Sequence, residues 1–390
     1  MPTPPLDDEV LTEALEVFDG TRTAKLPKGD KTAAANKLGI ARSTLSHRLK
    51  LAARRNLDGS ASGGAVPAGY GIKGTSTLYN LETGEAVRQW VKTDRDQERK
   101  EELIQEIREG FEDIKGTAPR LPKPKKVDER HLSVYPIVDH HFGMLAWGRE
   151  AGDDYDVEIA RDLLQRSAKK LVAQTPPSER CLILQLGDYF HMNDSKNVTP
   201  ASGHILDVDG RFRKTVRVGV HAMRDLIDLA LQRHKEVVVK CIKGNHDPEA
   251  SLTLEIGLEM SYENHDRVFI DTDPSDWWYF RYGKTLIGAT HGDRTKPERM
   301  ALHMAETCRE DWGETDYHWF VYGHIHHESA KEIGSVRCES FQTLAAKDSW
   351  TAKGGYSSGR SLQSVTLCAE HGETGRARIN IPPPLRRAAS

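Results

Sequence analysis

In the C-terminal two thirds of this chain of 390 residues, the spacing of apolar residues alternates between a strand pattern and a helix pattern. From about residue 131, short apolar runs typical of buried strands are separated by longer stretches with apolar residues at helical spacing. The strand-like runs are SVYPIV, CLILQLG, EVVVKCI, TLIGAT and HWFVYG. Helices are predicted near residues 156–173, 211–234, 250–263 and 296–310. Strands that alternate with helices in this way predict an α/β sandwich with buried strands.

The N-terminal residues have a purely helical pattern. Helices are predicted over residues 10–19, 31–38 and 42–54. Ala35 is a small residue where the last two helices would cross, and Gly39 supplies a left-handed turn between them. The apolar residues that would fill their shared core are Ile40, Leu45 and Leu49. This is a helix-turn-helix pattern, so we expect a small all-α N-terminal domain.

The last of these helices would expose a row of polar side chains, Arg42, Ser43, Ser46, His47 and Lys50. Such side chains suit the major groove of DNA and its phosphates. The stretch GIARSTLSHRLK resembles the terminal helix-turn-helix of Fis-like DNA-binding domains, which work as dimers. The resemblance implies DNA as a partner and a homodimer. The alternative is a small helical module for oligomerisation or docking.

A connecting region follows. Residues 57–74 are rich in Gly, Ala and Ser and predict a flexible linker, and residues 76–93 show two alternating runs around a glycine turn, which predict a β-hairpin. A highly charged helix is predicted over residues 95–115. Its apolar stripe, which needs a partner surface and suggests self-association, is Leu103, Ile107, Phe111 and Ile114. The predicted domains are residues 1–56, 57–130 and 131–385.

Charge and composition narrow the function. Residues 21–56 hold ten Lys and Arg and one acid, while the whole chain has a net charge of −3. A basic block on an otherwise acidic protein predicts a module that binds polyanions. No run of about 18 uncharged apolar residues and no secretory signal is visible, so we expect a cytoplasmic protein that does not enter a membrane. The five scattered cysteines indicate neither a disulfide framework nor a thiolate zinc site.

Asp, Asn, Gly and His gather in five short clusters. In chain order these are DHH at 139–141, GD at 187–188, GNHD at 244–247, HGD at 291–293 and GHIH at 323–326. Each cluster lies at or just after the carboxyl end of a predicted strand, where open α/β sheets place their sites. Side chains at positions i and i+2 of a strand point the same way. We therefore expect Asp139 and His141 to converge on one ion, and His324 and His326 likewise if they are extended.

Together the clusters resemble the pattern of the calcineurin-like metallophosphoesterase superfamily, D-x-H, G-D, G-N-H-D/E, H and G-H-x-H, over about residues 131–382. The resemblance implies a four-layer α/β/β/α sandwich with two divalent metal ions. One ion would be bound by Asp139, His141, Asp188 and His326. The other would be bound by Asp188, Asn245, His291 and His324. This mixed N and O set without Cys favours Mn²⁺, with Fe, Zn²⁺ or Mg²⁺ as alternatives.

The resemblance also implies two further histidine roles. His246 would contact the phosphate and act as general acid for the leaving oxygen. The stretch GDYFH is similar to the G-D-L-F-H of double-strand-break-repair nucleases in this superfamily, so His191 would be a second acid, base or phosphate contact. A packed residue behind the ligands is the alternative for His191. Asp247 either orients its loop or is structural.

The remaining polar neighbours have weaker predictions. His140 and His327 are expected to turn away from the ions. Asp293, Arg294 and Lys296 are candidate phosphate contacts. The polar insert over residues 192–214 is a candidate loop for positioning a nucleic-acid strand, with a plain surface excursion as the alternative.

Our leading hypothesis is a two-metal phosphodiesterase that hydrolyses DNA, as an exo- or endonuclease, and is recruited by the N-terminal domain. The Asp-Arg pair of the related protein phosphatases is missing after Asp188. A phosphatase or small-nucleotide phosphodiesterase of the same superfamily is one alternative, and a DNA-binding regulator with a non-catalytic metal domain is another. A helix-turn-helix before such a domain also resembles proteins encoded by bacteriophages and prophages, which implies a bacterial cytosol or a phage-infected cell.

Overall fold

The computed structural model describes residues 8–21, 30–54, 71–79, 86–94, 104–355 and 357–382. The chain forms two compact units, Met1–Glu106 and Ile107–Ser390. All five polar clusters belong to the second unit. Among the described residues, no helix combines the length and the apolar character needed to cross a lipid bilayer.

The first unit begins with helices at the ranges predicted, α1 (Asp8–Asp19), α2 (Lys31–Leu38) and α3 (Arg42–Arg54). The carboxylate of Asp30 accepts hydrogen bonds from the backbone N–H groups of the first turn and so caps α2. Gly39 ends α2 with a left-handed φ of 64°. The buried side chains between the helices are Ala14, Ala34, Ala35 and Leu45, with Ile40 and Leu49 packed against them. DNA binding by this unit stays a prediction.

An antiparallel hairpin follows in the same unit. Strand β1 (Gly71–Tyr79) pairs with β2 (Ala86–Asp94), where a hairpin was predicted. β1 begins inside the stretch predicted to be linker. The ladder shifts register between Ile72 and Gly74, and glycine is tolerated at such a bulge. The high glycine content of residues 57–74 therefore led to a linker being predicted where β1 begins.

The second unit contains two sheets. The six-stranded sheet has the order β13-β12-β3-β4-β5-β6, and the five-stranded sheet has the order β10-β11-β9-β8-β7. The first sheet contains β3 (Asp128–Ile137), β4 (Ser178–Leu186), β5 (Glu236–Ile242), β6 (Val268–Asp271), β12 (Arg360–Cys368) and β13 (Gly372–Ile381). The second contains β7 (Trp278–Tyr282), β8 (Thr285–Thr290), β9 (Tyr317–Tyr322), β10 (Ser329–Ile333) and β11 (Val336–Ser340).

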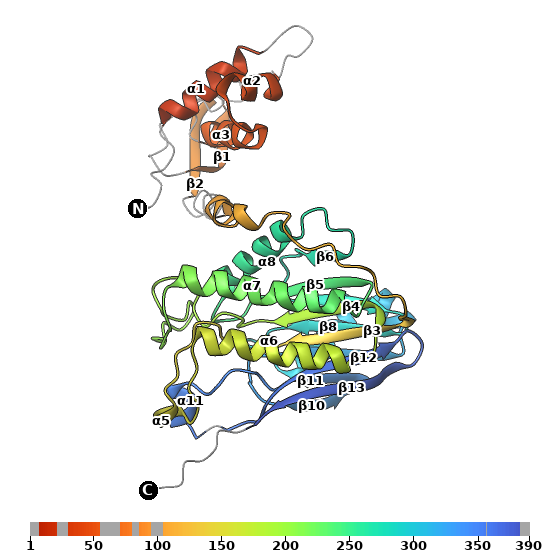
Figure 1. Cartoon of the computed structure of the whole chain (residues 1–390). Helices are drawn as coiled ribbons and strands as arrows, with labels where there is room; N and C mark the ends of the chain where they lie inside the picture. Colours follow the sequence, from red (N-terminus) through yellow and green to blue (C-terminus); the bar gives the residue numbers. More distant parts are fainter. Residues whose placement is uncertain are drawn as a thin grey trace. The chain divides into compact units, whose positions relative to one another are not determined.

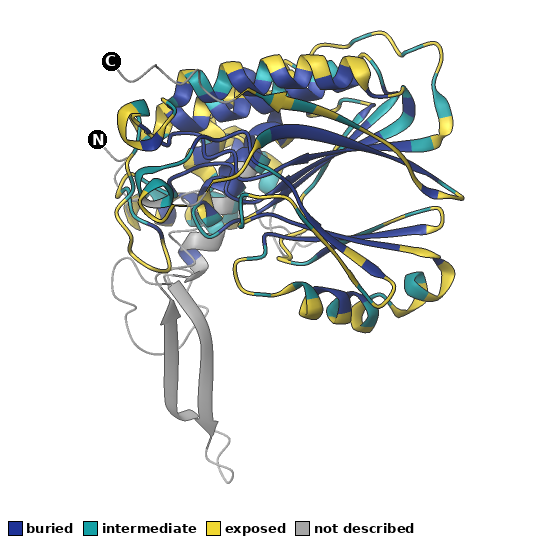
Figure 2. Cartoon of the chain, turned by 90° about the horizontal axis from the view of Figure 1, so that it is seen from below, coloured by how far each residue is buried: buried dark blue, intermediate teal, exposed yellow. Residues whose placement is uncertain are grey.

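The two sheets pack face to face. Leu182 and Leu184 of β4 lie in one buried cluster with Ile287 of β8 and with Trp319 and Val321 of β9. Residues two apart on a strand share a face, so each strand contributes its alternate apolar residues to this core. Figure 2 shows the buried residues concentrated in the strands and on the inner sides of the helices.

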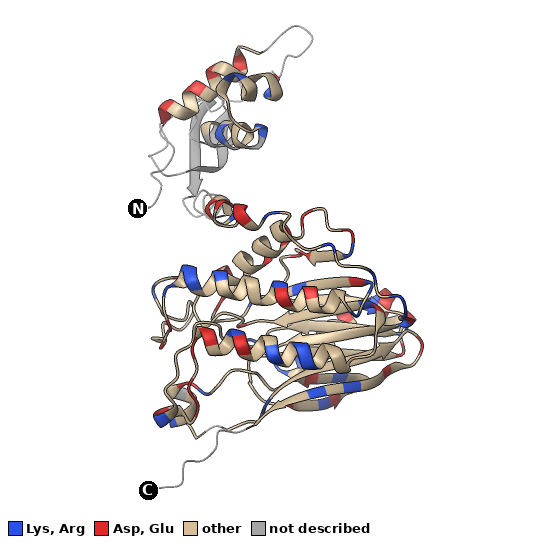
Figure 3. Ribbon diagram, viewed as in Figure 1, with Lys and Arg blue, Asp and Glu red and all other residues tan. Residues whose placement is uncertain are grey.

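Helices cover the outer faces of both sheets: Figure 1 shows those in front of the six-stranded sheet, and Figure 2 shows helices on either side of the two sheets. The six-stranded sheet is covered by α6 (Val157–Gln174), α7 (Phe212–Leu231) and α8 (Pro248–Ser261). Helix α9 (Pro297–Thr307), which α10 (Arg309–Glu314) follows, packs on the five-stranded sheet through Met300 and Met304 against Phe320. Lys, Arg, Asp and Glu lie along α6 and α7 (Figure 3). The layer order is therefore α, β, β, α, as the resemblance implied.

The apolar stripe predicted over residues 95–115 is buried within this unit. Residues 104–110 are helical, and Leu103 lies outside the described residues. Ile107, Phe111 and Ile114 are 9%, 5% and 5% exposed. Gly257 of α8 leaves room for the ring of Phe111. The stripe finds its partner surface in its own unit, so using it as an argument for self-association was wrong. The homodimer stays a prediction that rests on the N-terminal residues.

Glu255 on α8 makes the stability of this unit depend on pH. Burial raises the pKa of Glu255 from 4.5 to about 7, although the nearby Lys240 lowers it. The folded protein thus favours the neutral acid, and its contribution to stability is lost as the pH rises from 4.5 through about 7. We expect Glu255→Gln to remove this decline, measured by urea unfolding between pH 4 and 8. Parallel stability curves for the two proteins would contradict the prediction.

Candidate metal centre

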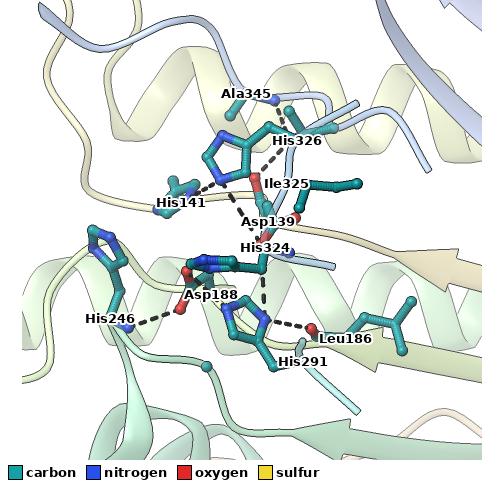
Figure 4. A network of polar contacts seen from close by, with 12 residues as sticks. Asp139, His141, Leu186, Asp188, His246, His291, His324, Ile325, His326 and Ala345 are labelled. Carbon is teal, nitrogen blue, oxygen red and sulfur yellow. Dashed lines mark hydrogen bonds and ion pairs between the residues drawn. The ribbon is translucent and has the colours of Figure 1, made fainter. Parts of the chain in front are cut away.

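The five polar clusters meet at one edge of the sandwich (Figure 4). Each follows the carboxyl end of a strand: β3, β4 and β5 of one sheet, and β8 and β9 of the other. Among the described residues, three groups of side chains have their donor atoms within 4.8 Å of one another. Two contain only predicted ligands, Asp139 with His141 and His326, and Asp188 with His291 and His324. The third is His141 with His191 and His246. The structure thus brings together residues that lie up to 187 positions apart in the sequence.

The backbone is left-handed at five of the six residues in the two ligand groups. The φ angles are 44° at Asp139, 52° at His141, 50° at Asp188, 70° at His324 and 55° at His326. Asp139 and His141 converge as expected, but turns rather than strand alternation bring them together, because β3 ends before their cluster begins. His324 and His326, whose cluster follows the end of β9, lie in different groups. Asp and His tolerate positive φ better than branched residues, at a strain of about 1–3 kcal/mol each.

Glycine brings the strand-end loops into close contact. Gly187 has a φ of 91°, which turns the chain directly before Asp188. Gly244 needs no positive φ, but a Cβ there would overlap both the backbone nitrogen and a carboxylate oxygen of Asp188. Two loops therefore approach each other at a distance that only glycine permits.

This contact predicts the effect of Gly244→Ala. The added methyl must displace Asp188, so we expect metal content and hydrolysis to fall sharply, with a stability loss of about 1–3 kcal/mol. Metal analysis and a phosphodiester assay on the folded variant would measure this. Gly313→Ala is the matched control, because nothing lies within 4 Å of a Cβ at that position. Equal metal content in both variants would contradict the prediction.

His291 is held in one orientation. Its Nδ1 donates to the carbonyl oxygen of Leu186 at 2.8 Å. Its Nε2 then lies 3.2 Å from Oδ2 of Asp188 and 3.0 Å from Oδ1 of Asn245. A hydrogen bond at one ring nitrogen that aims the other is typical of metal-binding histidines. Asn245 thus joins the second group of predicted ligands.

Asp188 is the anionic centre of the cluster. Burial acts to raise the pKa of its carboxyl group, but His291, His246 and His141 together outweigh burial and hold that pKa well below the usual range. Its Oδ1 accepts from the backbone N–H of His246 at 2.8 Å, while Oδ2 faces His291. A carboxylate that offers an oxygen to each side suits a bridging position between two ions.

The arrangement passes a structural test for metal binding. Oδ2 of Asp139 is buried and has no hydrogen-bond partner among the described residues. Burial raises the pKa of Asp139 to about 8, although His291 lowers it. Nε2 of His141 and Nε2 of His326 face each other at 3.2 Å. A cation would satisfy the buried oxygen and both imidazoles, and the donor set of imidazole, carboxylate and amide fits a divalent metal.

His191 and His246 stack beside this cluster. Their ring centroids are 5.1 Å apart at 26°, and His246 Nδ1 donates to the carbonyl oxygen of His191 at 3.0 Å. His191 Nδ1 lies 3.1 Å from His141 Nδ1. Burial lowers the pKa of His191 to about 3, so its ring is neutral. His191 therefore contacts a predicted ligand and the predicted general acid, while its own catalytic role stays a prediction.

Asp247 joins the loops around the site. Its carboxylate accepts from the backbone N–H groups of Asp188 at 3.1 Å, Gly244 at 2.9 Å and Phe190 at 3.0 Å. Of the two roles predicted for it, the geometry favours orientation of the loops. Sequence reasoning missed Thr343, whose hydroxyl donates to the carbonyl oxygen of Asp139 at 2.5 Å, because no motif surrounds it.

The other predicted neighbours lie outside the two groups. His140 is buried and its Nε2 bonds the carbonyl oxygen of Ala160 at 3.1 Å, and His327 is exposed, with Nδ1 2.7 Å from the carbonyl oxygen of Ile325. Both turn away from the predicted ligands. Arg294 pairs with Asp293 at 3.3 Å, and Lys296 precedes α9. Phosphate contact by these three residues stays a prediction.

The predicted DNA-contact residues belong to the first unit. Arg42 is exposed and Ser46 is half-buried. The side chains of Ser43, His47 and Lys50 lie outside the described residues. DNA contact by all five stays a prediction.

Comparison with known proteins gives weak similarities only. No protein-family model and no curated protein matches the sequence. A dimetal phosphatase from Danio rerio is 9% identical with a TM-score of 0.34, covering 64% of this chain and 98% of that one. An archaeal phosphodiesterase is 12% identical with a TM-score of 0.32, covering 64% and 99%. A phosphoesterase from E. coli is 14% identical with a TM-score of 0.29, covering 63% and 98%.

Proposed function

We propose that this chain is a two-metal phosphodiesterase of the calcineurin-like metallophosphoesterase superfamily that hydrolyses DNA. The observation that carries the proposal is the buried, partnerless oxygen of Asp139 within two converging groups of Asp and His side chains. Such a cluster is costly for a fold unless cations bind it. The motif order supports the superfamily, and GDYFH supports the nuclease branch.

The metal ligands follow from the two groups. Asp139, His141 and His326 would hold one ion, with Asp188 as the shared ligand that the resemblance implies. Asp188, Asn245, His291 and His324 hold the other. Mn²⁺ is the favoured metal. When bound, the two ions lower the pKa of water and neutralise charge on the phosphoryl oxygens.

His246 supplies the proton for the leaving oxygen. Its backbone N–H and its Nδ1 are both engaged, with Asp188 and with the carbonyl oxygen of His191. These contacts fix the ring and leave Nε2 as the atom that donates to the departing oxygen. His191 holds the other side of the stack and orients His141.

The N-terminal unit supports DNA as the substrate. A left-handed Gly39 separates α2 from α3, as in the predicted helix-turn-helix, and residues 21–56 hold ten Lys and Arg against one acid. A tethered DNA-binding module raises the local concentration of DNA near the catalytic unit. The proposed setting is the cytosol of a bacterium or of a phage-infected cell, with the protein acting as a homodimer.

A cleavage assay tests the proposal. Linear and circular DNA are incubated with the full chain and Mn²⁺, Mg²⁺, Zn²⁺ or Fe²⁺, with EDTA as the control. Cleavage of linear DNA supports the proposal, and cleavage of circular DNA assigns endonuclease activity. Rapid turnover of a nucleotide or phosphoprotein with intact DNA would favour a phosphatase or small-nucleotide phosphodiesterase. DNA binding without hydrolysis of any phosphoester would favour a regulator.

A further inference from the structure

Exposed apolar side chains lie on two loops beside the metal centre. Trp147 is 60% exposed, Leu145 is 46% exposed and Ile205 is 88% exposed. Exposed apolar side chains that gather on adjacent loops form a candidate binding surface. We call Leu145, Trp147, Arg149 and Ile205 the rim.

The rim is connected directly to the predicted metal ligands. Only six residues lead from His141 to Trp147, so the two lie at most about 22 Å apart. Within this stretch Met144 and Ala146 are buried while Leu145 and Trp147 are exposed, so the exposed pair share one face. The backbone of Phe142 is hydrogen-bonded to that of Tyr189 at 2.7 Å, which fixes the loop against the Asp188 loop.

The second loop is the polar insert over residues 192–214. Met144 pairs with Val208, and Leu145 N–H donates to the carbonyl oxygen of Asp207 at 3.0 Å. Ile205 is anchored in turn by its pairing with Val198. The insert therefore packs beside the Trp147 loop, and the two together border the centre.

Cations accompany the aromatic ring. The Arg149 guanidinium carbon lies 5.9 Å from the centre of the Trp147 ring, a cation–π distance. Arg211 and Arg213, at the start of α7, are also exposed. Among the described residues, none of these three arginines forms an ion pair with a carboxylate. The carboxylates of Glu150 and Glu158 pair instead with Lys353 and Lys214.

We infer that the rim binds the unpaired bases of a single-stranded nucleic acid and leads the strand to the metal centre. Bases can stack on an exposed indole such as Trp147, while Arg149 over its ring and the exposed Arg211 and Arg213 at the start of α7 neutralise backbone phosphates. A separation of at most about 22 Å is spanned by no more than about six stacked nucleotides. This inference rests on the proposed function, because it specifies which form of nucleic acid that site receives.

Kinetics of rim variants test the inference. In the full chain with Mn²⁺, Trp147→Ala raises KM for a single-stranded oligonucleotide by about 5- to 150-fold, the effect of losing one stacked base. The loss on bis(p-nitrophenyl) phosphate, which has no bases to stack, is smaller. Trp147→Phe restores most of the KM. Phe269→Ala is the matched control, because Phe269 is 63% exposed on β6, outside the rim. Equal losses on both substrates, or none, would overturn the inference.

A binding experiment separates the inference from the proposed function. Fluorescence anisotropy of a labelled oligothymidylate is measured on His246→Ala protein with Mn²⁺, with and without Trp147→Ala. A Kd that rises about 5- to 150-fold supports the rim whether or not the wild-type protein cleaves DNA. An unchanged Kd overturns it. Binding of phosphatidylglycerol vesicles that depends on Trp147 while oligonucleotide binding does not would assign the rim to a lipid surface instead. If wild-type protein hydrolyses the small diester and no DNA, the proposed function fails and the anisotropy result still decides on the rim.

Discussion

Asp188→Asn is expected to empty the centre of metal and to abolish hydrolysis. Asparagine has the same shape and keeps an oxygen for the backbone N–H of His246, but it removes the negative charge placed between the two groups of ligands. Groups one shell further from a metal already change affinity by roughly 10–100-fold, so we expect a larger loss here. Metal content per chain by mass spectrometry, together with turnover of a phosphodiester, measures both effects.

Asp225→Asn is the matched control for this change. Asp225 is exposed on α7 and receives its hydrogen bond from Gln165, outside the centre. The control should retain metal and activity at wild-type levels. An Asp188→Asn protein that still binds two ions per chain would show that Asp188 does not bridge them.

His246→Ala is expected to lower turnover of DNA by about 10²–10⁴-fold while the metal content stays unchanged. The contact of His246 with Asp188 runs through the backbone nitrogen, which alanine keeps. Alanine also removes the stack on His191 and the hydrogen bond from Nδ1 to the carbonyl oxygen of His191, but the chemical step that it removes is proton donation to the leaving oxygen. The defect should therefore nearly vanish on bis(p-nitrophenyl) phosphate, whose leaving group departs without a proton.

Two comparisons make this prediction sharp. His327→Ala removes an exposed histidine from the neighbouring loop and should behave as wild type. An equal loss for His246→Ala on DNA and on the activated diester would show that His246 binds substrate or positions the loop rather than donating a proton.

The strands that position the site were readable because they are buried on both faces. Continuous apolar runs such as those of β4 and β5 have few other interpretations, and the helices between them keep a clear apolar stripe. The other strands escaped the analysis: the edge strands β6, β7, β10 and β13 and the inner strands β11 and β12 are short or mix polar with apolar residues. The partner of the Phe111 stripe was also invisible, because α8 lies far along the sequence.

The site was predicted by residue type and order, but not by geometry. The GNHD and GHIH clusters identify the donors, whereas the left-handed turns that aim them leave no periodic signal. The carbonyl oxygen of Leu186 and the hydroxyl of Thr343 orient two donors from outside any motif. Any residue can offer a backbone carbonyl, so no sequence pattern reports its use.

At the five metal-centre residues with a left-handed backbone, Asp and His supply the site but lower the stability of the fold. Glycine would relax each position, so the fold alone would favour glycine where Asp and His now stand. On the proposed function, selection for hydrolysis is what preserves these side chains. Descendants that abandon the reaction should accumulate glycine or asparagine there first, and such chains should melt at a higher temperature than a metal-free ancestor that keeps all five.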